Sequence, residues 1–230
     1  MFFLLKQFIY TIFCVIILCK GGLMNIKVNF HSSVIINENI YIDPLNLEHA
    51  KKAKYVFITH PHWDHYSKED VNKIIDENTK IICPLSMKNE LADNHLKKAF
   101  FVEPNKAYVV DDIMFETFPS YNINKNFHSK ANNWVGYTLN INNKRISIVG
   151  DSDSTKELQQ LKTDILLLPI GGTYTMDVQE AANLTNTIKP QMAIPTHYGE
   201  VVGDKNLGNR FAKLIDKNIK VDVMLYSNEK

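Results

Sequence analysis

The chain alternates between short apolar runs and polar turns, and the spacing of the apolar positions predicts many short strands. Residues 27–36 and 38–43 alternate apolar with polar positions around a turn at 37–39, which is typical of a β-hairpin. Wholly apolar runs at 55–59 and 165–169 indicate strands buried on both faces. Further strands are expected at 80–83, 107–110, 114–119, 134–141, 144–149, 191–195 and 220–226.

Helical patterns fall between these strands. In segment 67–78, Ser67 can cap a helix with Asp70 three residues on, and Val71 and Ile74 lie on one apolar face. The other expected helices cover 86–96, 177–188 and 207–216. Hairpins early in the chain and strands alternating with helices later predict an α/β fold of mixed sheets covered by helices.

Size and charge narrow the class of protein. The chain has 230 residues, enough for one substantial core. Lysine plus arginine number 26 and aspartate plus glutamate 25, for a net charge of +1. This balance argues against a nucleic-acid-binding protein, which would be strongly basic. Three cysteines, Cys14, Cys19 and Cys83, have no spacing typical of a zinc knuckle or redox pair, so a reduced compartment is expected.

The first 23 residues form an apolar leader that we set apart from the fold. The unbroken apolar run at 8–19 is shorter than the ~20 residues that span a bilayer, although counting from Met1 the stretch could just span it. A membrane anchor, a secretion signal and a misassigned start, with Met24 as the true first residue, all remain open. We therefore expect one domain over 24–230, cytoplasmic or, if the leader is real, membrane-anchored.

The segment Thr59-His60-Pro61-His62-Trp63-Asp64-His65 carries the strongest chemical signal. Three histidines and an aspartate form the pattern H-x-H-x-D-H where a buried strand ends and a capped helix begins, the usual place of a ligand crevice. His60 and His62 can point the same way, while Asp64 and His65 face a second centre. Imidazole and carboxylate together suit zinc, iron or manganese. The alternative is a solvated polar loop.

A pair of metal ions needs more ligands than one loop supplies, and other strand ends offer them. Asp151 follows a strand in Val-Gly-Asp and is preferred to its rival Asp153 because it is closer to the strand end. His197 follows the strand at 191–195, and His128 lies in a polar loop before the strand at 134. Each of these residues alone is as easily a surface residue or a turn former.

Two further histidines are interpreted as lying outside the site. His95 sits in the expected helix 86–96 beside lysines and is interpreted as a surface residue. His31 is either a structural hydrogen-bonding residue or a group that supports a ligand, and the structural role is favoured.

These motifs resemble the metallo-β-lactamase superfamily. His60 to His65 matches its signature loop, Val-Gly-Asp151 its later strand-ending aspartate, and Pro-Thr-His197-Tyr-Gly its last histidine. Phe-His31-Ser-Ser, Ile-Asp43-Pro and Pro-Ile-Gly-Gly-Thr-Tyr174 resemble the branch that includes L-ascorbate phosphate lactonase and N-acylphosphatidylethanolamine phospholipase D.

The resemblance implies an αβ/βα sandwich of two mixed sheets and a metal site at one edge. It implies one ion held by three histidines, a second held by an aspartate and two histidines, and an aspartate bridging the two. The chain departs from the pattern around its central histidine, which lacks the usual Gly-rich turn. The implied ligands are His60, His62 and His128, then Asp64, His65 and His197, and finally Asp151 as the bridge.

The function expected from these features is a dinuclear metal-dependent hydrolase. A metal-bound hydroxide would cleave an ester, lactone or phosphodiester bond of a small molecule, with Asp64 orienting the nucleophile or taking a proton. Zn²⁺ is the first choice for the two divalent ions, with Mn²⁺ or Fe²⁺ as alternatives. Competing hypotheses are a non-hydrolytic di-iron redox or metal-binding protein and a membrane-tethered binding module.

Overall fold

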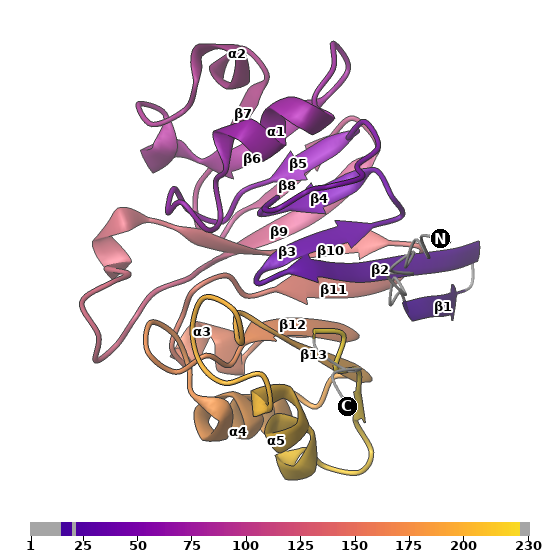
Figure 1. Cartoon of the computed structure of the whole chain (residues 1–230), viewed down its shortest axis with the longest axis vertical. Coiled ribbons are helices and arrows are strands. Elements are labelled where there is room, and N and C mark those ends of the chain that lie inside the picture. Colours follow the sequence, from indigo (N-terminus) through magenta and orange to yellow (C-terminus); the bar gives the residue numbers. More distant parts are fainter. Residues whose placement is uncertain (1–14, 20–21, 226–230) are drawn as a thin grey trace, which may run out of the picture.

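Two facing β-sheets with helices outside them form the molecule (Figure 1). The computed structural model describes residues 15–19 and 22–225. Within these residues, one sheet has the order β1-β2-β3-β4-β5-β6-β7 and the other the order β14-β13-β12-β11-β10-β9-β8. This arrangement confirms the predicted sandwich of two mixed sheets.

The strands of the first sheet are β1 (Val15–Cys19), β2 (Gly22–Phe30), β3 (Ser33–Ile36), β4 (Ile40–Ile42), β5 (Tyr55–Phe57), β6 (Lys80–Pro84) and β7 (Ala99–Val102). Those of the second sheet are β8 (Ala107–Val110), β9 (Ile113–Pro119), β10 (Val135–Ile141), β11 (Lys144–Ile148), β12 (Ile165–Pro169), β13 (Met192–Thr196) and β14 (Lys220–Val221).

Helical segments cover the two ends of the sandwich. Figure 1 shows α1 and α2 at one end and α4 and α5 at the other. The segments are α1 (Lys68–Ile74), η1 (Leu85–Met87), α2 (Asp93–Leu96), η2 (Lys130–Asn132), α3 (Lys156–Gln159), α4 (Val178–Ile188) and α5 (Leu207–Leu214).

Each sheet changes from antiparallel to parallel pairing along its width. Strands β1 to β4 pair antiparallel, and β4 to β7 pair parallel. Likewise β8 to β11 pair antiparallel, and β11 to β14 pair parallel. Parallel strands end at the same edge of a sheet, so the loops after β11, β12 and β13 leave side by side.

Aromatic side chains fill the space between the sheets. The ring of Phe57 lies 5.2 Å from Phe115 and 5.1 Å from Tyr137, both at edge-to-face angles that aromatic pairs prefer. The hydroxyl of Tyr137 donates to the carbonyl of Ile58 across the interface at 2.7 Å. This bond ties the end of β5, where the candidate loop begins, to the opposite sheet.

The first predicted helix is confirmed, but it is shorter than expected. Ser67 caps α1 by accepting from the backbone N–H of Asp70, as the sequence indicated. The helix ends at Ile74 because Ile75 already has extended backbone angles. The predicted strand at 220–226 is also short, with β14 covering only two residues. Tyr226 lies outside the described residues.

The expected helix at 86–96 is wrong. The chain forms η1, a turn and α2 instead, and then the strand β7, which sequence reasoning missed. The backbone N–H of Ala92 donates to the hydroxyl of Tyr66 at 3.1 Å, a tertiary bond in place of a helical one.

His95 is buried, which corrects its interpretation as a surface residue. Its Nδ1 lies 2.7 Å from the hydroxyl of Tyr66, and its Nε2 lies 2.9 Å from Oδ1 of Asn72.

Part of the apolar leader belongs to the first sheet. Strand β1 pairs antiparallel with β2, from Val15 opposite Ile26 to Cys19 opposite Gly22. Residues 1–14 and 20–21 of the expected leader lie outside the described residues. Among the residues that the structure describes, none forms a helix with the length and apolarity needed to cross a bilayer.

Removing the Tyr66 hydroxyl tests the buried bonds around His95. Tyr66→Phe leaves a ring nitrogen and a backbone N–H without their partner, so we expect a loss of about 1–3 kcal/mol in the free energy of unfolding. Urea denaturation measures it. The matched control, Tyr174→Phe at an exposed ring, should stay within about 0.5 kcal/mol of the parent. Equal stability of the two variants would contradict the inferred role of these bonds.

Candidate metal centre

The loop between β5 and α1 places four candidate residues at one end of the sandwich. Its turn is closed by the carbonyl of His62, which accepts from the backbone N–H of His65 at 3.0 Å and of Tyr66 at 2.8 Å. His60 and His65 are buried, while His62 and Asp64 are partly exposed. The loop therefore carries two donors into the interior and two at its surface.

The second sheet supplies the other three candidates. Asp151 follows β11 after Gly150, whose φ of +67° belongs to the left-handed region that favours glycine. His197 follows β13, and His128 lies in the long connection between β9 and β10. All three are at most 4% exposed.

The structure brings the seven candidate residues close together. Nε2 of His60 lies 3.1 Å from Nδ1 of His62, and the His128 ring lies about 5 Å from both rings. Carboxylate oxygens of Asp151 lie 3.2 Å from Nε2 of His65, 3.3 Å from Nε2 of His128 and 3.0 Å from Nε2 of His197.

Three overlapping groups in the cluster have donor atoms that all lie within 4.8 Å of one another. The carboxylate of Asp151 faces His128 from one expected ligand set and His65 and His197 from the other, as a bridging residue would. The groups are His60, His62 and His128; His60, His65 and Asp151; and His31, Asp64, His65 and His197.

Unpaired buried atoms in the cluster fit bound cations. Six buried side-chain atoms have no hydrogen-bond partner among the described residues. Such atoms normally cost about 1–3 kcal/mol each. A metal ion accepts the lone pairs of imidazole nitrogen and carboxylate oxygen. The atoms are Nδ1 of His31, Nε2 of His65, Nε2 of His128, Oδ1 of Asp151, and Nδ1 and Nε2 of His197.

The charges of the cluster favour a cation as well. Burial penalises the charged form of Asp151, but His197 and His65 outweigh burial and hold the pKa of its carboxyl well below its usual range. Burial likewise opposes ionisation of Asp64, but the nearby rings of His197, 3.6 Å away, and His31, 3.2 Å away, still lower its pKa. Both carboxylates are therefore ionised at neutral pH.

The pKa values of the buried imidazoles shift in opposite directions. Burial lowers the pKa of His60 well below its ordinary value, and it lowers the pKa of His31 to about 4. Burial would also lower the pKa of His65, but Asp151 and Asp43 outweigh it and raise that pKa well above the ordinary value. A cation that binds here therefore competes with a proton for His65.

Neighbouring side chains fix the orientation of the rings. Nδ1 of His65 donates to Asp43 at 2.7 Å, and Asp43 also accepts from the backbone N–H and the hydroxyl of Thr59. Nδ1 of His128 faces Oδ1 of Asn122 at 2.9 Å. In both rings Nε2 is left to face the cluster, which is the usual arrangement around metal ligands.

Sequence reasoning gave Asp43 no place in the site. The residue appeared only as part of Ile-Asp-Pro, and nothing in the local pattern separates it from an ordinary strand-ending turn. Asp43 could have been found only from the strand order. Strand β4 pairs parallel with β5, so the residues that follow the two strands lie at the same edge of the sheet.

Asp153, the alternative to Asp151 as a metal ligand, binds residues of a neighbouring loop instead. Its carboxylate lies 2.6 Å from Nζ of Lys125, and it accepts from the backbone N–H of Ile123 at 2.8 Å and from Asn122 at 3.2 Å. These bonds hold the loop that carries His128. The structure turns Asp151, and not Asp153, toward the cluster.

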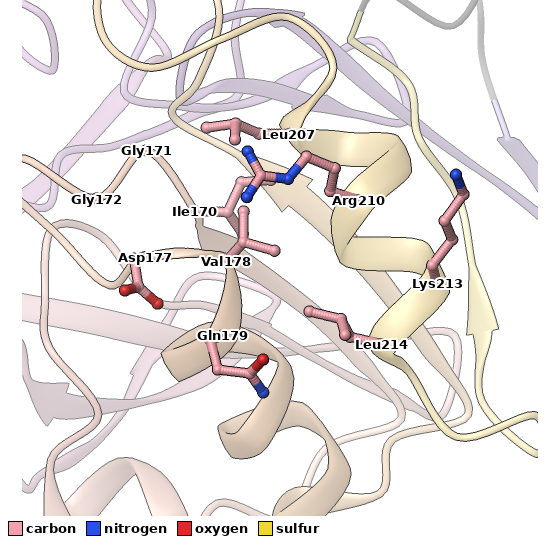
Figure 2. A pocket seen from close by; sticks show the side chains of 10 residues that line it. All are labelled: Ile170, Gly171, Gly172, Asp177, Val178, Gln179, Leu207, Arg210, Lys213 and Leu214. Carbon is pink, nitrogen blue, oxygen red and sulfur yellow. The ribbon is translucent and has the colours of Figure 1, made fainter.

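A separate pocket lies between α4 and α5. It encloses about 490 Å³, and Figure 2 shows the Arg210 side chain reaching over it from α5. Gly171 and Gly172 form one of its walls. A Cβ at Gly171 would lie 2.4 Å from the carbonyl oxygen of His197, so this glycine lets the pocket wall pack directly behind His197. None of the seven predicted residues lines this pocket.

Comparisons with known proteins agree with the fold. The β-lactamase superfamily domain family matches residues 26–197. A UPF0173 protein from Pyrococcus furiosus is 31% identical over 166 residues, covering 70% of this chain and 75% of the relative. A UPF0173 metal-dependent hydrolase from Pyrococcus abyssi is 27% identical over 219 residues, covering 86% of this chain and 96% of the relative.

Solved structures share the same architecture. A crystal structure of a Parabacteroides distasonis protein described as a metal-dependent hydrolase has a TM-score of 0.80 and 26% identity, covering 92% of this chain and 97% of that one. A metallo hydrolase from Ignicoccus hospitalis has a TM-score of 0.69 at 22% identity, covering 87% and 94%.

The structure is an αβ/βα sandwich that carries a cluster of histidine and aspartate side chains at one edge. The chain belongs to the β-lactamase superfamily. The narrower likeness to the lactonase and phospholipase D branch stays a prediction.

Replacing the carboxylate behind His65 tests the orientation of its ring. In Asp43→Asn the amide N–H₂ faces Nδ1 of His65, which favours the tautomer with its proton on Nε2, pointing into the cluster. We expect Zn²⁺ affinity to fall about 10–100-fold in chelator-competition titrations.

The matched control for this experiment is Asp111→Asn. Asp111 is an exposed turn residue with a φ of +50°, which asparagine tolerates. Its Zn²⁺ affinity should equal that of the parent. An unchanged affinity in Asp43→Asn would mean that this carboxylate does not prepare His65 for a metal.

Proposed function

We propose that the chain is a dinuclear metal-dependent hydrolase acting on a small molecule. One ion would be held by His60, His62 and His128, and a second by Asp64, His65 and His197, with Asp151 between them. The observation that carries the proposal is the convergence of these seven donors with their buried, unpaired nitrogen and oxygen atoms.

The chain's own residues would prepare the site in defined ways. Divalent ions, when bound, supply a Lewis acid and lower the pKa of a bound water to about 7. Thr59 and Asp43 keep Nε2 of His65 free to face the cluster, and Asn122 does the same for His128. Asp64 is partly exposed and ionised, so its carboxylate can orient a nucleophile by accepting a hydrogen bond from it.

Hydrolysis is favoured over the non-hydrolytic alternative by the relatives. The Pyrococcus abyssi relative and the Parabacteroides distasonis protein are both described as metal-dependent hydrolases. The donor set of imidazole and carboxylate suits Zn²⁺, with Mn²⁺ and Fe²⁺ as the alternatives.

Aromatic side chains around the centre favour a substrate with an apolar body. Trp134 is half-buried, and its ring lies 4.9 Å from both His60 and His62. Phe127, next to His128, is 48% exposed, and it packs edge-to-face on Tyr174 at 4.7 Å. Exposed aromatic rings beside a polar centre are typical of a binding surface for apolar groups.

The two lysines that flank His128 in the sequence are already paired with carboxylates, which argues against a phosphodiester. Lys125 contacts Asp153 at 2.6 Å, and Lys130 contacts Glu157 at 2.8 Å. Phosphate recognition normally uses a free lysine or arginine. We therefore propose a neutral ester or lactone with an apolar or aromatic group as the substrate class.

Metal removal gives the first test of the proposal. Of the chain's two tryptophans, Trp134 packs on His60 and His62, and Trp63 lies between His62 and Asp64 in the sequence, so their emission is expected to report binding there. We expect Co²⁺ to quench the emission of chelated protein, and His62→Ala to weaken this response and reduce turnover at least about 100-fold. His49→Ala, at an exposed histidine outside the cluster, should behave as the parent. Full activity of a metal-free sample would contradict the proposal.

A matched substrate panel tests the bond and the apolar body. With metal-loaded protein, kcat/KM should be higher for a neutral aryl ester than for bis(p-nitrophenyl) phosphate. Phe127→Ala should lower the aryl ester's kcat/KM about 2–10-fold, the effect of losing one aromatic contact. Val109→Ala, an exposed apolar residue on β8, serves as the control. A preference for the phosphodiester that Phe127→Ala leaves unchanged would exclude this substrate class.

A further inference from the structure

His31 has a backbone conformation that an ordinary turn residue rarely keeps. It lies in the two-residue turn between β2 and β3, with a φ of +53°. It is only 1% exposed, although most hairpin turns are at the surface. A non-glycine residue held in the left-handed region often marks a functional position.

The ring of His31 faces the second group of the centre. Its Nε2 lies 3.2 Å from Oδ2 of Asp64, and its ring centroid lies 3.8 Å from that of His197. Its carbonyl accepts from the backbone N–H of His197 at 3.0 Å. His31 therefore contacts two of the three residues expected to hold the second ion.

A ring nitrogen of His31 lies close enough to the expected ligands of the second ion to bind the same ion. One ring nitrogen of His31 lies within 4.8 Å of a donor atom of each of Asp64, His65 and His197, and these donors are equally close to one another. Zinc binds imidazole nitrogen and carboxylate oxygen at about 2.0–2.2 Å, so donors around one ion lie a few ångströms from one another.

We propose that His31 is an additional protein ligand of the second metal ion, beside Asp64, His65 and His197. This inference rests on the proposed function, since it assigns a role within the same centre. It makes the two ion positions unequal. Counting the shared Asp151, the position at His60, His62 and His128 would have four protein ligands, and the position at His31 would have five. The first ion would therefore be the less fully coordinated of the two.

This difference in coordination predicts different roles for the two ions. The second ion would be retained tightly and would stabilise the turn against the β13 loop. The first ion would be the one open to substrate, on the side where Trp134 packs against His60 and His62. A role for His31 limited to its hydrogen bond with Asp64 is the competing explanation.

Two substitutions separate a ligand from a hydrogen-bond donor. In His31→Gln the side-chain amide nitrogen falls close to the place of Nε2, so it can still donate to Asp64 but is a poor metal ligand. In His31→Asn the side chain is too short to replace Nε2, and asparagine tolerates a φ of +53°. His49→Asn, at an exposed site, is the control.

The experiment is a Co²⁺ titration of chelated full-length protein, followed by visible absorption and by metal content after gel filtration. The parent should bind two ions with separable affinities. Both His31 variants should lose affinity for one ion by more than about 100-fold, beyond the usual effect of a supporting residue. The other ion should bind as in the parent, and the absorption bands of the weakened ion should change. Thermal unfolding of the metal-free variants checks that they fold.

The outcomes are distinct. Parent-like binding of both ions by His31→Gln would assign His31 to hydrogen bonding alone and overturn the inference. Parent-like binding by His31→Asn would overturn it as well. In both cases the proposed function stands, because the parent still binds two ions. If the parent binds no Co²⁺, the proposed function fails together with this inference.

Discussion

The carboxylate of Asp43 and the residues it binds hold the centre together. Asp43 is buried at the end of β4, where it accepts from both donors of Thr59 and from Nδ1 of His65. Burial raises the pKa of this carboxyl, and the bonds that it accepts compensate its lost hydration. The same bonds fix the start of the β5–α1 loop and aim His65 at Asp151. This small network thus joins the first sheet's parallel edge to the candidate metal site.

The rest of the cluster depends on two sheets that meet at one edge. The loops after β5, β11 and β13 bring side chains from positions 60 to 197 within a few ångströms. Tyr137 and Phe57 keep these edges in register by packing between the sheets. Because packed interiors transmit small shifts, substitutions far from the donors can move the donors themselves. Gly171, whose backbone lies against His197, is such a position.

Polarity is distributed unevenly around this edge. The interior holds ionised carboxylates and unpaired imidazole nitrogens, whereas the rim carries exposed aromatic rings and lysines already paired with carboxylates. An uncharged substrate with an apolar body matches both regions. The carbonyl can face the polar interior while the rest of the molecule rests on the aromatic rim.

The sequence by itself determined most of the strands, because hydrophobic periodicity is read within a few residues, but it missed β1 and β7 and joined β2 and β3 into one strand over 27–36. The sequence also contained the dense loop motif His60 to His65, whose resemblance to the superfamily implied the sandwich class. It also indicated Asp151, His128 and His197, but only as weak candidates at strand ends. Only the tertiary structure decided that these residues meet, that Asp43 and Asn122 orient the rings, and that His31 turns inward. It also decided that His95 is buried and that residues 86–96 do not form one helix. The reason is physical: a donor's partner across 100 residues is set by strand pairing and sheet packing, which no local pattern encodes.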